Sequence, residues 1–289
     1  MSDHARDRQT GITTLDVTRS QRSRADLLAA LRARAIPVIA YFGALVVLLQ
    51  FYSWFRKTYF QRPAEIAFRN ALDVIEFQAR IGLAVERVEL PLQDWTLQHA
   101  WLIDAMNLYY RQMKPVLYVA ALLCLMLAPR AFPRIWWGFV IATAIGFPMY
   151  ALYPLAPPRL MGPFGYPFVD TLEVFGGVQS SSEGLGGANQ YAAMPSMHIC
   201  WSIFAAFWLA AALPWRRIGL ALGALHVALM SFSVVVTGNH YVLDVIAGAL
   251  VAGVAIVIAG RLPEYPGRAL VNWIRRRATA RAAPHARAG

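Results

Sequence analysis

Long runs of apolar residues that end at prolines or charged residues dominate this sequence and leave few folds open to it. A helix needs roughly 20 apolar residues to cross the hydrocarbon core of a bilayer. Hydrophobic residues make up 58% of the chain and charged residues 15%, which is too apolar for an ordinary soluble domain. We therefore predict an all-α integral membrane protein with six transmembrane helices. The six runs are 36–55, 113–128, 135–153, 196–213, 217–237 and 241–260.

Arginines in the segments between these runs predict which side of the membrane each segment occupies. With six spans, the leader, the loops near residues 130 and 216, and the tail all fall on one side, and all four are rich in arginine. Short cytoplasmic segments are enriched in lysine and arginine. The sequence thus predicts a multi-pass protein of the cell membrane with both termini in the cytoplasm. Segments 56–112 and 154–195 are then extracytoplasmic, and the helical apolar spacing of the first predicts that it lies along the interface.

The formal net charge of +11 does not indicate nucleic acid, because the basic residues sit beside the apolar runs. Such residues bind anionic lipid headgroups. Cys124 and Cys200 lie within apolar runs and suggest neither a disulfide framework nor a metal cluster. We divide the chain into a disordered leader (1–24), one six-helix membrane domain (25–262) and a basic tail (263–289).

Polar residues stand at the outer ends of three different predicted spans. They are Arg159, His198 and His240, and Asp244 follows His240 by four residues, which predicts that both lie on one helix face. An imidazole oriented by a carboxylate is a nucleophile or base, and a second histidine can protonate a leaving oxygen. Ser196 at a helix start and the Arg159 guanidinium both suit phosphate. Together these residues predict a metal-free phosphoryl-transfer site at the outer membrane surface.

Two other interpretations use the same residues. His198, His240 and Asp244 could be ligands of a metal ion, although a nearby arginine disfavours a cation and no further carboxylate accompanies them. The chain could also be a transport or scaffold protein whose histidines form a buried polar network. Such a network would not require an aspartate four residues after His240.

Three short motifs carry a family resemblance. "PSMH" (195–198) and "GNHYVLD" (238–244) resemble the second and third motifs, P-S-x-H and S-R-x5-H-x3-D, of the type 2 phosphatidic acid phosphatase superfamily. With "YPLAPPR" (153–159), they look most like its inositolphosphotransferase branch, which includes the fungal inositol phosphorylceramide synthases. The resemblance extends loosely from about residue 70 to 260 and implies that 25–262 is a catalytic domain.

The resemblance also implies a role for each matched residue. His240 would form a phosphohistidine, Asp244 would orient it, and His198 would act as general acid. Arg159 would bind phosphate, and Ser196 would contribute a hydrogen bond. No cofactor and no metal are implied.

Three positions depart from the broader pattern. Leu152 replaces the lysine of the first motif, Leu160 its proline, and Val234 the arginine of the third. The inositolphosphotransferase branch similarly lacks that arginine. We take Lys114, at the outer end of the second span, as the candidate for the missing charge, with Asn239 as a neutral donor.

The expected substrate is a phospholipid or lipid phosphate, and the expected reaction moves a phosphoryl-containing, inositol phosphate-like headgroup to a hydroxyl acceptor. With water as acceptor, the same chemistry makes a lipid phosphate phosphatase. Asp170 and Glu183 are weaker candidates for binding the acceptor's hydroxyls. The sequence does not fix the donor, the acceptor or the oligomeric state.

Overall fold

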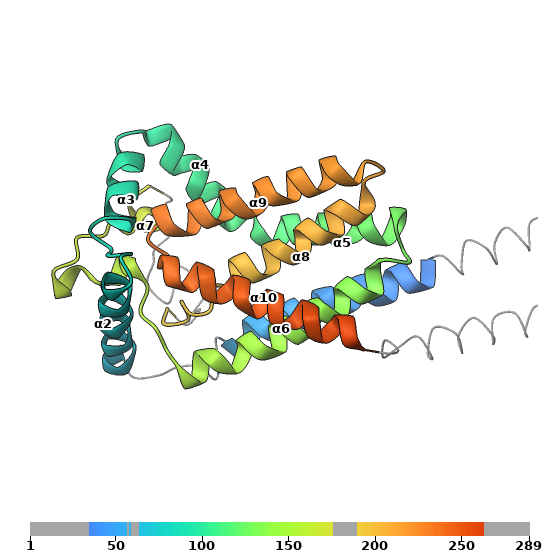
Figure 1. Cartoon of the computed structure of the whole chain (residues 1–289), viewed down its shortest axis with the longest axis horizontal. Coiled ribbons are helices and arrows are strands. Elements are labelled where there is room, and N and C mark those ends of the chain that lie inside the picture. Colours follow the sequence, from blue (N-terminus) through green and yellow to red (C-terminus); the bar gives the residue numbers. More distant parts are fainter. Residues whose placement is uncertain (1–34, 57, 59–63, 176–189, 263–289) are drawn as a thin grey trace, which may run out of the picture. The chain divides into compact units, whose positions relative to one another are not determined.

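The computed structural model describes residues 35–56, 58, 64–175 and 190–262 (Figure 1). The chain divides into two units, one of residues 1–44 with 266–289 and one of residues 45–265. Only residues 35–44 of the first unit are described, and they are helical. The predicted leader (1–24) and tail (263–289) lie outside the described residues.

Every regular element in the described part of the second unit is a helix, and only a single bridge between Leu155 and Ala192 has strand-type pairing. The predicted all-α class is therefore confirmed. After the first helix, described as Ala35–Arg56, the α-helices are α2 (Ala64–Arg80), α3 (Glu89–Leu97), α4 (Ala100–Arg111), α5 (Met113–Leu127), α6 (Phe132–Leu152), α7 (Thr171–Val174), α8 (Met197–Ala212), α9 (Arg216–Val236) and α10 (Val242–Arg261).

All six predicted apolar runs form helices, but they differ in length. The first helix, α6, α9 and α10 have 20 to 22 residues and are long and apolar enough to cross a membrane. Helices α5 and α8 have 15 and 16 residues and are shorter than a usual span. The structure thus supports four candidate spans, and the total of six stays a prediction.

Helix α8 packs against α5, α6, α9 and α10 (Figure 1). Small residues allow the close approach: a Cβ added at Gly219 of α9 would lie 2.7 Å from the Cα of Ala210, and one added at Gly248 of α10 would overlap the Ser196 carbonyl oxygen. Because α9 ends where α8 and α10 begin, the starts of α8 and α10 meet at the same end of these helices.

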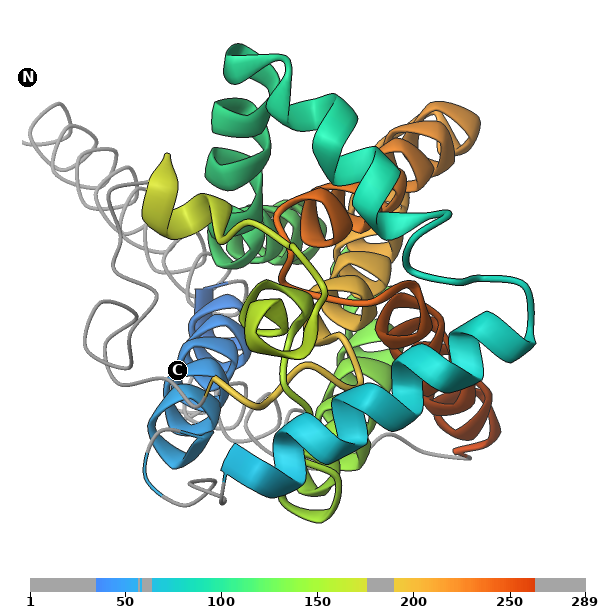
Figure 2. The same cartoon turned by 90° about the vertical axis from the view of Figure 1, so that its left-hand side faces the viewer.

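Helices α2, α3, α4 and α7 gather at that end, where Figure 2 shows α2 crossing it. The buried face of α2, which includes Ala67, Ala71 and Val74, packs in one cluster with Met161 and Tyr241. Other apolar residues of α2, Leu72 and Phe77 among them, are exposed. The predicted outer segment therefore rests on the helix ends that carry the predicted site residues.

Candidate active site

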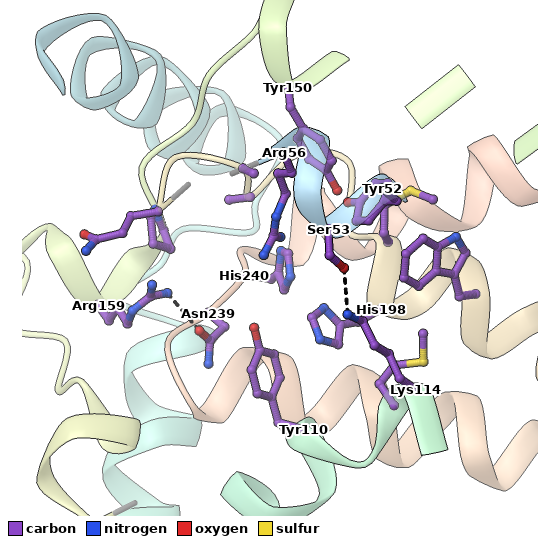
Figure 3. A pocket seen from close by; sticks show the side chains of 17 residues that line it. Tyr52, Ser53, Arg56, Tyr110, Lys114, Tyr150, Arg159, His198, Asn239 and His240 are labelled. Atoms are coloured by element: carbon purple, nitrogen blue, oxygen red, sulfur yellow. Dashed lines mark hydrogen bonds between the residues drawn. The ribbon is translucent and has the colours of Figure 1, made fainter. Parts of the chain in front are cut away.

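A cavity of about 220 Å³ opens where these helix ends meet (Figure 3). Its polar lining comes from stretches that are far apart in the sequence, which explains why no single sequence motif contains it. The polar lining residues are Tyr52, Ser53 and Arg56 of the first helix, Tyr110 of α4, Lys114 of α5, Tyr150 of α6, Arg159 and Gln190 of the connecting loop, His198 of α8, and Asn239 and His240 before α10.

The structure brings most of the predicted site residues to this cavity. Arg159, His198, His240, Lys114 and Asn239 line it, whereas Asp244 and Ser196 are fully buried behind it.

His240 lies in the turn between α9 and α10 and not on a helix. The N–H groups of Asn239 and His240 both donate to the carbonyl of Val234, at 3.1 and 3.0 Å, and Gly238 takes the left-handed conformation (φ +67°) that such a turn requires. The expectation that His240 and Asp244 share one helix face was therefore wrong. They still meet, because the turn brings the imidazole to the first turn of α10.

Asp244 approaches His240 through one carboxylate oxygen. Its Oδ2 lies 3.4 Å from His240 Nδ1 and accepts the Tyr241 N–H at 2.9 Å. The Asp244 side chain has no exposed surface and His240 is 4% exposed. A carboxylate in this position favours the tautomer with the proton on Nδ1, which leaves the lone pair of Nε2 for chemistry.

His198 stands in the first turn of α8 and faces the second imidazole. Its ring is stacked on Tyr110 with 4.3 Å between centroids, and its centroid lies 5.6 Å from that of His240. Burial raises the pKa of the Tyr110 phenol, an effect that Arg159 and Arg56 partly oppose. Tyr110 is thus a neutral aromatic wall that supports the His198 ring.

Arg159 is held by three contacts and is 9% exposed. Its Nη1 donates to Asn239 Oδ1 at 2.8 Å, its Nε lies 3.1 Å from Asp170 Oδ2, and its backbone N–H donates to the Gly238 carbonyl at 2.9 Å. Asp170, a candidate for binding acceptor hydroxyls, is therefore the ion partner of Arg159, while Glu183 lies outside the described residues. The Asn239 amide that accepts from Arg159 is itself held in place, because its Nδ2 donates to Thr237 Oγ1.

Arg56 is a lining residue that sequence reasoning missed. Among the described residues no carboxylate forms an ion pair with it, and its buried Nε has no hydrogen-bond partner there. Figure 3 shows its guanidinium directed toward His240. Lys114 reaches the cavity from α5, and its Nζ donates to Ser53 Oγ at 2.8 Å. Three cationic side chains therefore surround the two histidines, and only Arg159 is paired with an acid in the described part of the chain.

Two positions that depart from the motifs, Leu152 and Val234, bring no positive charge to the cavity. Leu152 is 76% exposed at the end of α6, away from the cavity lining, and Val234 is buried and contributes its carbonyl to the His240 turn. Arg56 follows an apolar run directly, and that position is its only sequence signal, since a charged residue is expected at the end of any span.

Ser196 is the N-cap residue of α8, but its side chain caps no N–H. Its backbone N–H donates to the Asp244 carbonyl at 3.0 Å, which ties α8 to α10. Its Oγ has no partner among the described residues and does not line the cavity. The predicted hydrogen bond from Ser196 to phosphate has no direct route in this arrangement and stays a prediction.

In the part of the chain that the structure describes, no three His, Cys, Asp or Glu side chains are grouped as metal ligands would be. His240 and Asp244 point at each other, so they do not share a common point with His198. The metal interpretation therefore has no set of ligands in these residues, whereas the cations suit an anion.

A family model of the PAP2 superfamily matches residues 72–258, more than half of the chain. Comparison with curated proteins and with solved structures gave no match. The matched range includes Arg159, His198, His240 and Asp244, whereas Arg56 precedes it. The match supports the superfamily and does not distinguish its branches. The chain therefore belongs to the PAP2 superfamily, whose members are phosphatases and phosphotransferases.

Proposed function

We propose that this protein is a membrane lipid phosphotransferase that works through a phosphohistidine on His240. The observation that carries the proposal is the pair of imidazoles 5.6 Å apart, one backed by a buried carboxylate, in a cavity lined by three cationic side chains. The donor is a phospholipid, and the transferred group is its phosphoryl-containing headgroup, of the inositol phosphate type.

In the first half-reaction, the Nε2 lone pair of His240 attacks the phosphorus of the donor. The N–P bond forms as the P–O bond to the lipid alcohol breaks, and protonated His198 gives its proton to the leaving oxygen. Asp244 stabilises the positive charge that develops on the His240 ring. His198 is left neutral.

In the second half-reaction, neutral His198 takes the proton of an acceptor hydroxyl. The acceptor oxygen attacks the phosphorus, the N–P bond breaks, and both histidines return to their starting protonation states. With water as acceptor, the product is free phosphate or a phosphorylated headgroup, and the enzyme is a phosphatase. The motif resemblance to the inositolphosphotransferase branch favours an alcohol acceptor.

The cations supply the charge that the phosphoryl oxygens need in both steps. The fork of Arg159 is fixed by Asn239 and Asp170, while Arg56 and Lys114 approach from the first helix and α5. Donors fixed in advance and aimed at developing negative charge stabilise the transition state. We therefore propose a metal-independent reaction, for which turnover would be insensitive to EDTA.

The test uses purified protein in detergent with phosphatidic acid or phosphatidylinositol as donor, and with ceramide present as acceptor. Free phosphate and new phospholipid are measured together. New phospholipid that disappears in His240→Ala and persists in the control His99→Ala supports the transferase. Free headgroup or phosphate alone, with the same dependence on His240, means a phosphatase. Full activity in His240→Ala overturns the mechanism. Substrate transport by the protein reconstituted in vesicles, without any reaction, supports a carrier.

We also propose that the cavity faces the extracytoplasmic side. Cys124 and Cys200 are buried, so a cysteine introduced at residue 180 can be labelled over a low background. An impermeant maleimide should label Ser180→Cys in intact cells and should label Arg130→Cys only after lysis. The opposite labelling pattern would place the cavity on the cytoplasmic side and would leave the proposed reaction unchanged.

A further inference from the structure

Two buried side chains from the outer segment cap the start of α10. Glu89 Oε1 accepts the Val242 N–H at 3.0 Å, and Gln78 Oε1 accepts the Leu243 N–H at 2.9 Å. Gln78 Nε2 donates to the same Glu89 oxygen at 2.7 Å. The end of α2 and the beginning of α3 therefore act together on the first turn of α10, whose N–H groups have no partner within the helix.

The burial of this pair requires an explanation. Gln78 and Glu89 have no exposed surface, and among the described residues no lysine, arginine or histidine forms an ion pair with Glu89. A buried carboxylate without a cation is costly unless hydrogen bonds and a favourable potential offset its desolvation. The positive end of α10 offers both, since the Val242 N–H donates to Glu89 Oε1 and the helix dipole favours negative charge there, while Oε2 is buried without a partner among the described residues.

The capped turn is the one that sets the His240–Asp244 geometry. Val242 and Leu243 lie between His240 and Asp244 in the chain, so the backbone that Glu89 and Gln78 hold determines the 3.4 Å separation of Nδ1 and Oδ2. Val234 holds this stretch from the other end, through the N–H of His240.

We propose that Glu89 and Gln78 are positioning residues for phosphoryl transfer, which fix the first turn of α10 and thereby the alignment of His240 with Asp244. Their effect on turnover rests on the proposed function of His240. Neither side chain lines the cavity, so both would act on catalysis through the backbone of α10.

Substitutions at Glu89 separate the hydrogen bond from other effects. Glu89→Ala should lower kcat by roughly ten- to a hundredfold with little change in KM, by analogy with the loss of residues that orient the ligands of metal sites. Glu89→Gln keeps an oxygen for the Val242 N–H and should retain most of the activity. Glu86→Ala, an exposed glutamate in the same segment, is the matched control and should behave as wild type.

A double-mutant cycle distinguishes positioning from general stability. In an Asp244→Asn background the His240 alignment is already lost, so Glu89→Ala should lower the residual kcat by less than about twofold. An equal fall in both backgrounds would overturn the proposal, because the cap would then act independently of the pair. A fall in kcat for Glu89→Gln as large as for Glu89→Ala would also contradict it.

Hydrogen–deuterium exchange measures the protection of the first turn of α10 directly and needs no substrate. A peptide covering residues 240–246 should exchange faster in Glu89→Ala and Gln78→Ala than in wild type or Glu86→Ala. Unchanged exchange would mean that Glu89 and Gln78 do not hold the first turn of α10, and it would overturn the proposal even if the enzyme is active. Faster exchange in a protein that reacts with no donor leaves the cap in place and removes the proposed function, and with it the catalytic role of Glu89 and Gln78.

Discussion

Asp244 meets His240 from the third position of the following helix, with its Oδ2 3.4 Å from the histidine's Nδ1. The same oxygen accepts the Tyr241 N–H at 2.9 Å. The Tyr241 N–H therefore fixes the position of this carboxylate oxygen independently of His240. A carboxylate placed in advance in this way can hold one tautomer of the imidazole and stabilise its charged form.

The first prediction concerns this carboxylate. In Asp244→Asn one amide atom replaces Oδ2, which serves both contacts. As oxygen it keeps the Tyr241 N–H but lacks the charge that stabilises His240, and as nitrogen it loses that bond and favours the wrong tautomer of His240. We expect kcat to fall by about 10³-fold or more, with folding preserved. The measurement is turnover in detergent with phosphatidic acid and phosphatidylinositol, together with circular dichroism. Asp104→Asn, at an exposed position of α4, is the control, and equal activity of the two variants would remove Asp244 from the mechanism.

The second prediction concerns the two cations that approach from the first helix and α5. Arg56→Ala should lower kcat/KM by roughly 10²-fold, the effect of removing one donor to transition-state charge. Arg56→Lys should recover part of this loss, because it restores charge without the guanidinium fork. Lys114→Ala should weaken turnover strongly as well. Arg111→Ala, at an exposed site close in sequence to Lys114, should leave kcat/KM unchanged. Normal turnover of either cavity variant would exclude that residue from the phosphate site.

The helices of this chain follow directly from its sequence, because an apolar run of about 20 residues has few alternatives to a helix in lipid. His198, His240 and Arg159 were recognisable for a related reason, since each is polar at the end of an apolar run. The run lengths alone did not settle the number of spans, as α5 and α8 are shorter than 20 residues.

Other residues were harder to recognise. Arg56 also ends an apolar run, but a charge is expected there in any span, and it is more than 100 positions away from Arg159. The segment that holds Gln78 and Glu89 has balanced charge and ordinary amphipathic spacing. Their burial results from α2 and α3 packing over the helix ends, and only the tertiary fold brings their side chains to Leu243 and Val242.

The third prediction separates the ring of Tyr110 from its hydroxyl. Tyr110→Phe keeps the surface that stacks on His198 at 4.3 Å and should retain most of kcat, whereas Tyr110→Leu should lower it about tenfold by loosening the imidazole. Because the pKa of this phenol is raised above its usual value of 10.0, the hydroxyl stays neutral at mildly alkaline pH. The alkaline limb of the pH–rate profile should then be the same in wild type and Tyr110→Phe. A limb that moves in the phenylalanine variant would give the hydroxyl a part in proton transfer.

The fourth prediction tests whether the contact between α8 and α10 sets the distance between the two histidines. A methyl group added at Gly248 would overlap the Ser196 carbonyl oxygen, whereas one added at Gly253, further along the same helix, meets nothing within 4 Å. Gly248→Ala must therefore push α10 away from the start of α8, which carries His198. We expect a loss of about 1–3 kcal/mol in the free energy of unfolding, and a fall in kcat larger than the small population of unfolded protein accounts for. Gly253→Ala should be neutral or slightly stabilising, because alanine favours helix more than glycine does.

Thermal unfolding and turnover of the two variants in the same detergent give the comparison. If Gly248→Ala loses stability but keeps its kcat, the helix contact supports the fold alone, and the His198–His240 distance is set by the turn before α10.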